Sequence, residues 1–165
     1  MKAAVVRGVK DIRVEEIPVP EISDDEVLLE VKYCGICGSD LISFLRAEHY
    51  KPGTYIGHEY AGVLTKVGKN VKGMKEGDRV TVNPGYICGE CFGCIHGEPQ
   101  QCVHFVDMGT GVTTGLEFAG AYTKYVRVPI PEKRVYQLPD NVSFEVGGDD
   151  GTPRQFVPCG EGIRP

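Results

Sequence analysis

Hydrophobic and polar residues alternate in several short runs along the chain, a period of two that predicts β-strands joined by tight turns. The runs cover residues 2–7, 11–17, 26–33, 60–67, 79–82 and 121–128. The first two flank a Gly-Val-Lys turn and form a predicted hairpin. A strand-rich fold follows, with one short helix predicted over residues 40–45 and Ser39 or Asp40 as its cap.

The alternation also assigns residues to faces of the predicted sheet. In the third run three apolar residues share a face opposite two charged ones: Val27, Leu29 and Val31 against Glu30 and Lys32. In the fourth run one parity contains Ala61, Val63, Thr65 and Val67. Cys34 is predicted to be a small buried strand residue. The residues expected to pack the interior from later strand positions are Tyr122, Tyr125 and Tyr136.

Composition narrows the class of protein. The 165 residues suffice for one large domain, and 41% of them are hydrophobic, enough for a buried core. Twenty-two glycines and eleven prolines strengthen the prediction of many turns. Eighteen basic and 23 acidic residues give a net charge of −5, so a nucleic-acid partner is not expected.

The N-terminus and the cysteines bear on the cellular compartment. No apolar run approaches the ~18 residues that a membrane span needs. Arg7 interrupts the N-terminus before the apolar core of a signal peptide could form. We therefore expect a cytoplasmic protein with no membrane partner. The seven cysteines would stay reduced there, which favours metal ligation over disulfides.

A glycine-rich loop over residues 85–102 holds four cysteines. The spacing is C-x2-C-x2-C-x7-C, formed by Cys88, Cys91, Cys94 and Cys102. Four thiolates with no open position are typical of a structural zinc site, which would also order a loop with little to bury. An iron–sulfur cluster is the alternative, but the bacterial ferredoxin run closes with a three-residue gap and a proline. Here the final gap is seven residues and Val103 follows.

A second set of donors is spread over two glycine-flanked strand ends. Cys37 lies in a Gly-Ile-Cys-Gly-Ser-Asp stretch, and His58 and Glu59 lie in Gly-His-Glu. A single histidine is more often structural, but the shared glycine context favours a common cleft. Thiolate and imidazole ligands can hold a second zinc that keeps a position open for a substrate oxygen. Ser39 is then placed to accept a substrate proton, and Asp40 to hold the His58 imidazole in one tautomer.

Taken together, these motifs resemble the zinc-dependent medium-chain alcohol dehydrogenases, nearest the polyol, butanediol and threonine dehydrogenases. GICGSD, GHE, GDRV, the four-cysteine loop and GAYTKYVRVP follow in the expected order between about residues 1 and 146. The resemblance implies a mainly β fold, a GroES-like β-barrel with a zinc-bound loop lobe and few short helices. It implies structural and catalytic zinc and NAD- or NADP-dependent oxidation of a secondary alcohol or polyol to a ketone. It also implies a homo-oligomer when full length.

The resemblance assigns roles residue by residue. Cys37 and His58 match ligands of the catalytic zinc, and Glu59 matches the neighbouring glutamate that can coordinate directly. Ser39 matches the proton-relay hydroxyl, and the four loop cysteines match the structural zinc site. Many members place a histidine shortly after the Ser-Asp pair to continue the relay. Here Leu-Ile-Ser follows that pair, so proton release would go through water or the cofactor ribose.

The second half of the family pattern is not found in these residues. No strand is followed by a GxGxxG unit, so we expect no Rossmann domain here and no activity from these residues alone.

The predicted catalytic domain covers residues 1–147, followed by an atypical tail at 148–165 with no apolar period. The codons for residues 148–153, read one nucleotide later, can encode Ala-Met-Met-Glu-Pro-Leu. Family members open a helix near such a Glu-Pro-Leu segment, and its glutamate is often the remaining catalytic-zinc ligand. A frameshift, a truncation with a vector tail and a natural short paralogue are the competing interpretations.

Two function classes fit the sequence. One is the catalytic domain of a zinc-dependent dehydrogenase, favoured by the donor set Cys37, His58 and Glu59. The other is a non-catalytic, zinc-stabilised barrel that acts as a binding or assembly module, favoured by the missing cofactor domain. A module of that kind would have no affinity for NAD or NADP.

Overall fold

The computed structural model describes residues 1–46, 52–83, 85–86, 88–98, 101–103, 106–107 and 120–148. The described elements are, in order, β1 (Lys2–Gly8), β2 (Asp11–Glu16), β3 (Glu26–Cys34), α1 (Gly38–Arg46), β4 (Tyr60–Val67), β5 (Arg79–Val82), β6 (Gly85–Tyr86), α2 (Phe92–Ile95), β7 (Val106–Asp107), β8 (Tyr125–Pro129), α3 (Pro131–Arg134), β9 (Val135–Gln137) and α4 (Phe144–Gly148). The prediction of a mainly β fold with few short helices is confirmed. Among these elements, no helix has the length and apolar character needed to span a bilayer.

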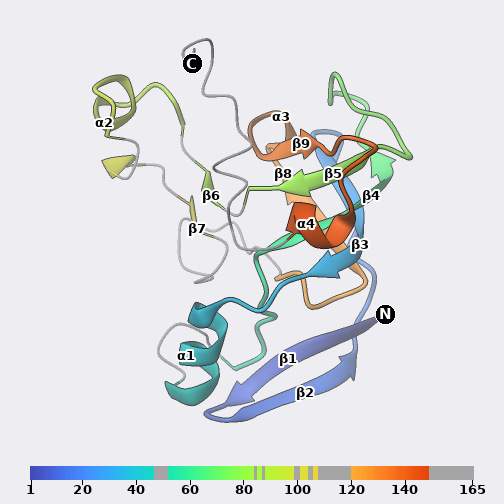
Figure 1. The fold of residues 1–165 in the computed structure, drawn as a ribbon, viewed down its shortest axis with the longest axis vertical. Helices are drawn as coiled ribbons and strands as arrows, with labels where there is room; N and C mark the ends of the chain where they lie inside the picture. The colour runs from blue at the N-terminus through green and yellow to red at the C-terminus, as the bar shows by residue number, and fades with distance from the viewer. Residues whose placement is uncertain are drawn as a thin grey trace.

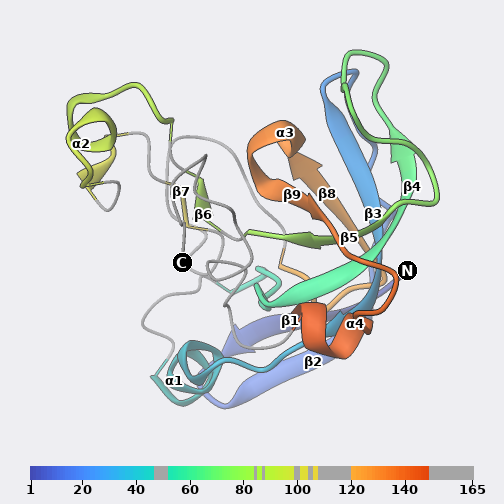
Figure 2. The same ribbon diagram turned by 45° about the horizontal axis from the view of Figure 1, so that its top comes forward.

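A five-stranded antiparallel sheet forms the centre of the molecule, with strand order β8-β3-β4-β5-β9. The β1–β2 hairpin is a separate two-stranded sheet, joined to the rest by isolated bridges from Ala3 to Thr123 and from Val5 to Tyr55. Figure 1 shows the hairpin and α1 on one side of the central sheet. Figure 2 shows the loop lobe with α2 projecting away from the sheet.

The predicted strand positions agree closely with the structure except at one place. β4 and β5 have the predicted bounds, and β1, β2 and β3 differ from theirs by one residue. The strand predicted over residues 121–128 is wrong at its start, because β8 begins only at Tyr125. The preceding backbone has other partners: the N–H of Tyr122 donates to Ile56 and its carbonyl accepts from Ala4. This stretch therefore connects the hairpin to the central sheet rather than extending β8.

The main core lies on one face of the five-stranded sheet. Its buried members are Val27, Leu29, Tyr60, Leu64, Val80, Val82, Ala121, Val126, Val128 and Val135. In β3 the predicted inward face is confirmed, since Val31 also packs against this cluster. β3 and β4 form the longest pairing, and irregularities interrupt it twice, between Leu28 and Leu29 and between Val31 and Tyr33.

These irregularities correct the faces predicted for β4. Leu28 pairs with Lys66 but Leu29 pairs with Leu64, so Thr65 is an extra residue in β4. One extra residue shifts the side-chain alternation by one position. Leu64 is consequently 1% exposed in the core, whereas Val63, on the parity singled out in the sequence, is only half-buried. Beyond the extra residue the original parity returns, and Val67 packs against the core.

Helix α4 closes one end of this core and crosses the predicted domain boundary at residue 147. It contacts β3, β4 and β5. The hydroxyl of Thr81 donates a hydrogen bond to the carbonyl of Gly147 at 2.7 Å, and Arg79 donates to the carbonyls of Pro139 and Val142 just before the helix. The rest of the predicted atypical tail, residues 149–165, lies outside the described part of the chain.

The shifted register in β4 predicts which of two adjacent residues stabilises the fold. Leu64→Ala should lower the free energy of unfolding by about 3 kcal/mol or more, because it removes a fully buried side chain and leaves a cavity. Val63→Ala should cost about 1 kcal/mol, since that side chain is only partly removed from water. Urea unfolding of the zinc-loaded chain measures both, with the half-exposed Leu45→Ala as control. A larger loss for Val63→Ala than for Leu64→Ala would contradict the register.

Candidate active site

The four loop cysteines converge as their spacing predicts. Their sulfur atoms all lie within 4.8 Å of one another. The Sγ–Sγ distances include 3.5 Å between Cys91 and Cys94 and 3.6 Å between Cys88 and Cys102. All four are free thiols. Such a closed set of four sulfur donors fits a tetrahedral structural zinc.

Short backbone contacts and one neighbouring helix position this lobe. The N–H of Cys91 points to the Cys88 sulfur at 3.3 Å, and the N–H of Cys88 points to the Cys102 sulfur at 3.4 Å. From α3, the Lys133 ammonium donates to the carbonyl of Cys88 at 2.7 Å. Its neighbour Arg134 is fully buried and donates through Nε to the carbonyl of Asn83. α3 therefore anchors the base of the lobe to the sheet.

The thiols of the lobe differ in acidity. Hydrogen bonds from the backbone of Cys94 and of Val103 lower the pKa of Cys91 to about 6. Desolvation raises the pKa of Cys94 to about 12. Neighbouring thiols of this kind titrate as a set, and four thiolates in contact need a cation to neutralise them. A divalent metal with soft-ligand preference meets that need.

The second donor set also comes together. The ligand atoms of Cys37, His58 and Glu59 lie within 4.8 Å of one another, although His58 is 21 residues from Cys37 along the chain. The end of β3 is held against the start of β4 by the Gly35 N–H, which donates to the Glu59 carbonyl at 2.7 Å. A Cβ on Gly35 would lie 2.8 Å from Oε2 of Glu59 and 3.3 Å from the carbonyl oxygen of Gly148, so a larger residue there would have to displace the Glu59 carboxylate. Three protein donors leave room for a further ligand, as in catalytic zinc sites.

Asp40 lies beside this cluster and is 3% exposed. Its Oδ2 accepts hydrogen bonds from the Cys37 N–H at 2.9 Å and from the Tyr122 hydroxyl at 2.8 Å. Its Oδ1 lies 3.6 Å from Nδ1 of His58, and neither of these two buried atoms has a hydrogen-bond partner within the described residues. An imidazole whose Nδ1 faces a carboxylate presents Nε2 to a metal, the usual arrangement of a metal-ligating histidine. The residues of this cluster therefore fit a metal ion.

The beginning of α1 differs from the prediction. The helix starts at Gly38, so neither Ser39 nor Asp40 precedes it as a cap. Instead Asp40, in the first turn, reaches back to the N–H of Cys37, which is the second half of a capping box. This hydrogen bond fixes Cys37 at the start of α1. A negative charge in the first turn also favours the helix dipole.

Ser39 is half-buried in the first turn of α1, two residues after Cys37. Its backbone carbonyl accepts a hydrogen bond from the hydroxyl of Ser43 at 2.8 Å. Within the described residues, no hydrogen bond joins the Ser39 hydroxyl to Cys37, His58 or Glu59. Its predicted role as a proton acceptor thus stays a prediction.

Tyr122 was not singled out by the sequence as part of the site. Its hydroxyl donates to Asp40 and lies 3.0 Å from the Gly35 carbonyl. Burial and the adjacent carboxylate of Asp40 raise the pKa of Tyr122 far above its usual range, so the hydroxyl remains a donor. The sequence around Tyr122 does not predict this contact, because Asp40 is 82 positions away along the chain.

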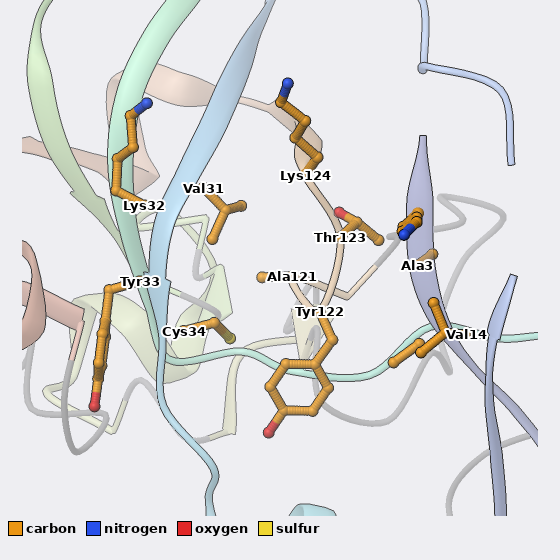
Figure 3. A pocket seen from close by; sticks show the side chains of 12 residues that line it. Ala3, Val14, Val31, Lys32, Tyr33, Cys34, Ala121, Tyr122, Thr123 and Lys124 are labelled. Atoms are coloured by element: carbon orange, nitrogen blue, oxygen red, sulfur yellow. The ribbon is translucent and has the colours of Figure 1, made fainter. Parts of the chain in front are cut away.

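An open pocket of about 380 Å³ lies between β1, β3 and residues 121–124, and Tyr122 is among its lining residues. Figure 3 shows Cys34 and Tyr122 among its lining side chains. Cys37, His58 and Glu59 do not line it. The pocket is therefore distinct from the donor cluster, although Tyr122 borders both.

The sequence of this chain matches a known family and known proteins. Residues 23–140 match the family described as alcohol dehydrogenase GroES-like domain. The chain is 37% identical over 152 residues to sorbitol dehydrogenase of Bacillus subtilis, a match that covers 88% of this chain and 40% of that protein. The chain belongs to the zinc-dependent medium-chain alcohol dehydrogenase family. It spans about 40% of the length of the curated relatives it matches.

Solved alcohol dehydrogenase structures share this fold. Galactitol-1-phosphate dehydrogenase from Escherichia coli has a TM-score of 0.78 and 32% identity over 90% of this chain and 41% of its own. An alcohol dehydrogenase from E. coli CFT073, solved with NADH, has a TM-score of 0.73 and 31% identity over 89% of this chain and 41% of its own. The resemblance inferred from the sequence motifs, including the polyol subgroup, is confirmed.

The four-cysteine lobe of this chain is predicted to depend on zinc. Cys102→Ser should remove one zinc equivalent per chain and unfold the lobe, because metal-ligand energy is folding energy in such loops. Metal analysis and limited proteolysis of the lobe measure the two effects. Cys34→Ser is the matched control, since Cys34 is a free thiol outside both donor sets. Equal zinc content in the Cys102→Ser variant and the unchanged chain would contradict the assignment.

Cys34 itself should be unreactive in the folded protein. Burial, aided by the charge of Asp40, raises its pKa to about 12 from an ordinary value of 9.0. The thiolate is the nucleophile, so this higher pKa slows alkylation at about pH 8 on the order of 1,000-fold. Iodoacetamide labelling followed by peptide mass spectrometry, with the chain unfolded in urea as reference, gives the ratio. Labelling at similar rates in both states would show that the thiol is neither buried nor raised in pKa.

Proposed function

We propose that this chain forms the catalytic domain of a zinc-dependent dehydrogenase that oxidises a secondary alcohol of the polyol class to a ketone with NAD or NADP. The observation that carries the proposal is the open cluster of Cys37, His58 and Glu59, whose ligand atoms lie within 4.8 Å of one another beside buried Asp40. Catalytic zinc sites have three protein donors and keep a fourth position open for substrate, whereas structural zinc sites have four protein donors and no open position.

The residues of the cluster would have separate tasks. Cys37 and His58 would bind the metal, with Glu59 as an adjacent carboxylate donor. A zinc ion held there supplies a Lewis acid toward the alcohol oxygen. Asp40 orients the imidazole of His58. Ser39 accepts the proton of the substrate hydroxyl and passes it to water or to the cofactor ribose, because Leu-Ile-Ser rather than a histidine directly follows Asp40.

The substrate and cofactor classes are supported by relatives. The Bacillus subtilis relative is named as a sorbitol dehydrogenase and the E. coli neighbour as a galactitol-1-phosphate dehydrogenase, both of which are named for polyols. The E. coli CFT073 neighbour was solved with NADH. Hydride transfer needs a nicotinamide held against the reacting carbon, a task for a dinucleotide-binding domain. We therefore propose that residues 1–165 alone do not turn over substrate, and that the complete enzyme is a homo-oligomer.

The alternative function is a non-catalytic binding or assembly module. The four-cysteine lobe would serve such a module equally well. A second, open donor cluster with a buried carboxylate behind it has no purpose in a purely structural barrel, and this favours the enzyme.

Metal content and turnover test the proposal together. The 165-residue chain should hold two zinc ions, and Cys37→Ser should hold one. Residues 1–146 joined to the part of the Bacillus subtilis sorbitol dehydrogenase that follows the matched region should reduce NAD or NADP with a polyol panel. In that fusion Cys37→Ser should lower turnover on the order of 1,000-fold, the several kcal/mol that metal catalysis supplies.

The matched control for this experiment is Cys34→Ser, which should keep both zinc ions and most of the turnover. A Cys37→Ser variant that retained two zinc ions or full activity would exclude the proposed cluster. Reduction of either nucleotide by residues 1–165 alone, above the Cys37→Ser background, would contradict the need for a cofactor domain.

A further inference from the structure

We propose that Tyr122 is a positioning residue for the open donor cluster: through Asp40 it holds the imidazole of His58 in the tautomer that leaves Nε2 free for a metal. The inference rests on the proposed function, since it concerns the same cluster. Tyr122 itself contacts none of the three donor side chains by a hydrogen bond that the described residues show. Its effect on the cluster is transmitted by Asp40 and by the backbone before His58.

The hydroxyl of Tyr122 makes the first connection. It has one proton and two acceptors, Oδ2 of Asp40 at 2.8 Å and the carbonyl of Gly35 at 3.0 Å. The charged carboxylate is the stronger acceptor. The same Oδ2 receives the N–H of Cys37 at 2.9 Å. Two donors thus fix one carboxylate oxygen, and the carboxylate plane can turn little about its bond.

The other oxygen of Asp40 is left for the histidine. Oδ1 lies 3.6 Å from Nδ1 of His58, and both atoms are buried without another partner in the described part of the chain. A neutral imidazole carries one N–H, so a carboxylate beside Nδ1 favours the proton there. Nε2 then keeps its lone pair. A carboxylate free to rotate would lose this preference for one tautomer.

The ring and backbone of Tyr122 make the second connection. Gly57, directly before His58, has a φ of +97°, and a Cβ there would lie 2.9 Å from Cδ1 of the Tyr122 ring. The Tyr122 N–H donates to the carbonyl of Ile56, and the Ala121 N–H donates to that of Gly57. Tyr122 is therefore tied to the segment that carries His58 as well as to the turn that carries Cys37. Its hydroxyl sets the angle of Asp40 between them.

Phenylalanine at this position separates the two connections. Tyr122→Phe keeps the ring against Gly57 and the backbone bonds, and removes only the donor to Asp40. The matched control is Tyr136→Phe, which removes a hydroxyl that donates to the carbonyl of Lys133. Lys133 belongs to α3 and contacts the four-cysteine lobe, so this change lies away from the donor cluster. A third variant, Asp40→Asn, removes the carboxylate through which Tyr122 is proposed to act.

Two readouts follow the state of His58 without any assay of activity. In the first, the chain is labelled with ¹⁵N-histidine and the open cluster is freed of metal with a chelator. Imidazole nitrogen shifts report the tautomer, and His58→Gln assigns the signal. In the second, Co(II) is titrated into the open cluster while the lobe remains loaded with zinc. The thiolate-to-Co(II) absorption band reports binding to Cys37.

The unchanged chain and Tyr136→Phe should show His58 as a single Nδ1–H tautomer. Tyr122→Phe and Asp40→Asn should show a mixture of tautomers. Tyr122→Phe should also bind Co(II) about 10-fold more weakly, the lower end of the effect of residues that orient metal ligands. The lobe should keep its zinc in every variant, which verifies that the chain is folded.

A single Nδ1–H tautomer in Tyr122→Phe, or in Asp40→Asn, would overturn the inference. So would equal Co(II) affinity of Tyr122→Phe and the unchanged chain. Failure of the unchanged chain to bind Co(II) at Cys37 would instead refute the proposed function. The tautomer measurement in the metal-free cluster would still decide the role of Tyr122.

Discussion

The close approach of three backbone segments determines where the chemistry of this chain lies. The N–H of Gly35 donates to the carbonyl of Glu59, and the N–H of Ala121 donates to that of Gly57. These bonds hold the end of β3, the start of β4 and the stretch before β8 together. Glycine is required at Gly57, which has a φ of +97° and where a Cβ would lie 2.9 Å from the ring of Tyr122. Cys37, His58 and Asp40 meet because the backbones that carry them are already fixed.

The two donor sets illustrate different ways of bringing ligands together. The four thiols of the lobe come from one loop, with few apolar side chains to bury, and Phe92 and Ile95 in it are exposed. Such a loop has little besides metal to compensate the entropy of ordering it. Cys37 and His58 instead sit where the hydrogen-bonded sheet ends. Their backbones are held by hydrogen bonds between strand ends, such as that from the N–H of Gly35 to the carbonyl of Glu59.

The sequence predicts those features that depend on local order along the chain. The bounds of β4 and β5, the first hairpin and the grouping of the four loop cysteines all follow from periodicity and spacing. The meeting of Cys37 with His58 required more, namely the motif order that resembles a known family. The burial of Leu64 could not be predicted, because it depends on an extra residue at Thr65 that only the pairing with β3 reveals.

Tyr122 is the clearest case of a contact beyond the reach of sequence patterns. Its position in the alternating pattern of the sequence is that of a core residue, and its ring packs against the smaller core cluster of Val6 and Ile56. Only the tertiary fold places its hydroxyl on Asp40, 82 positions away. Burying a phenol is costly unless its hydroxyl has a partner, and buried Tyr60 shows that this chain contains an unpartnered one among its described residues. The hydrogen bond of Tyr122 is therefore a specific feature of the site: it supplies a donor to Asp40, the carboxylate whose other oxygen faces the histidine that we propose as a metal ligand.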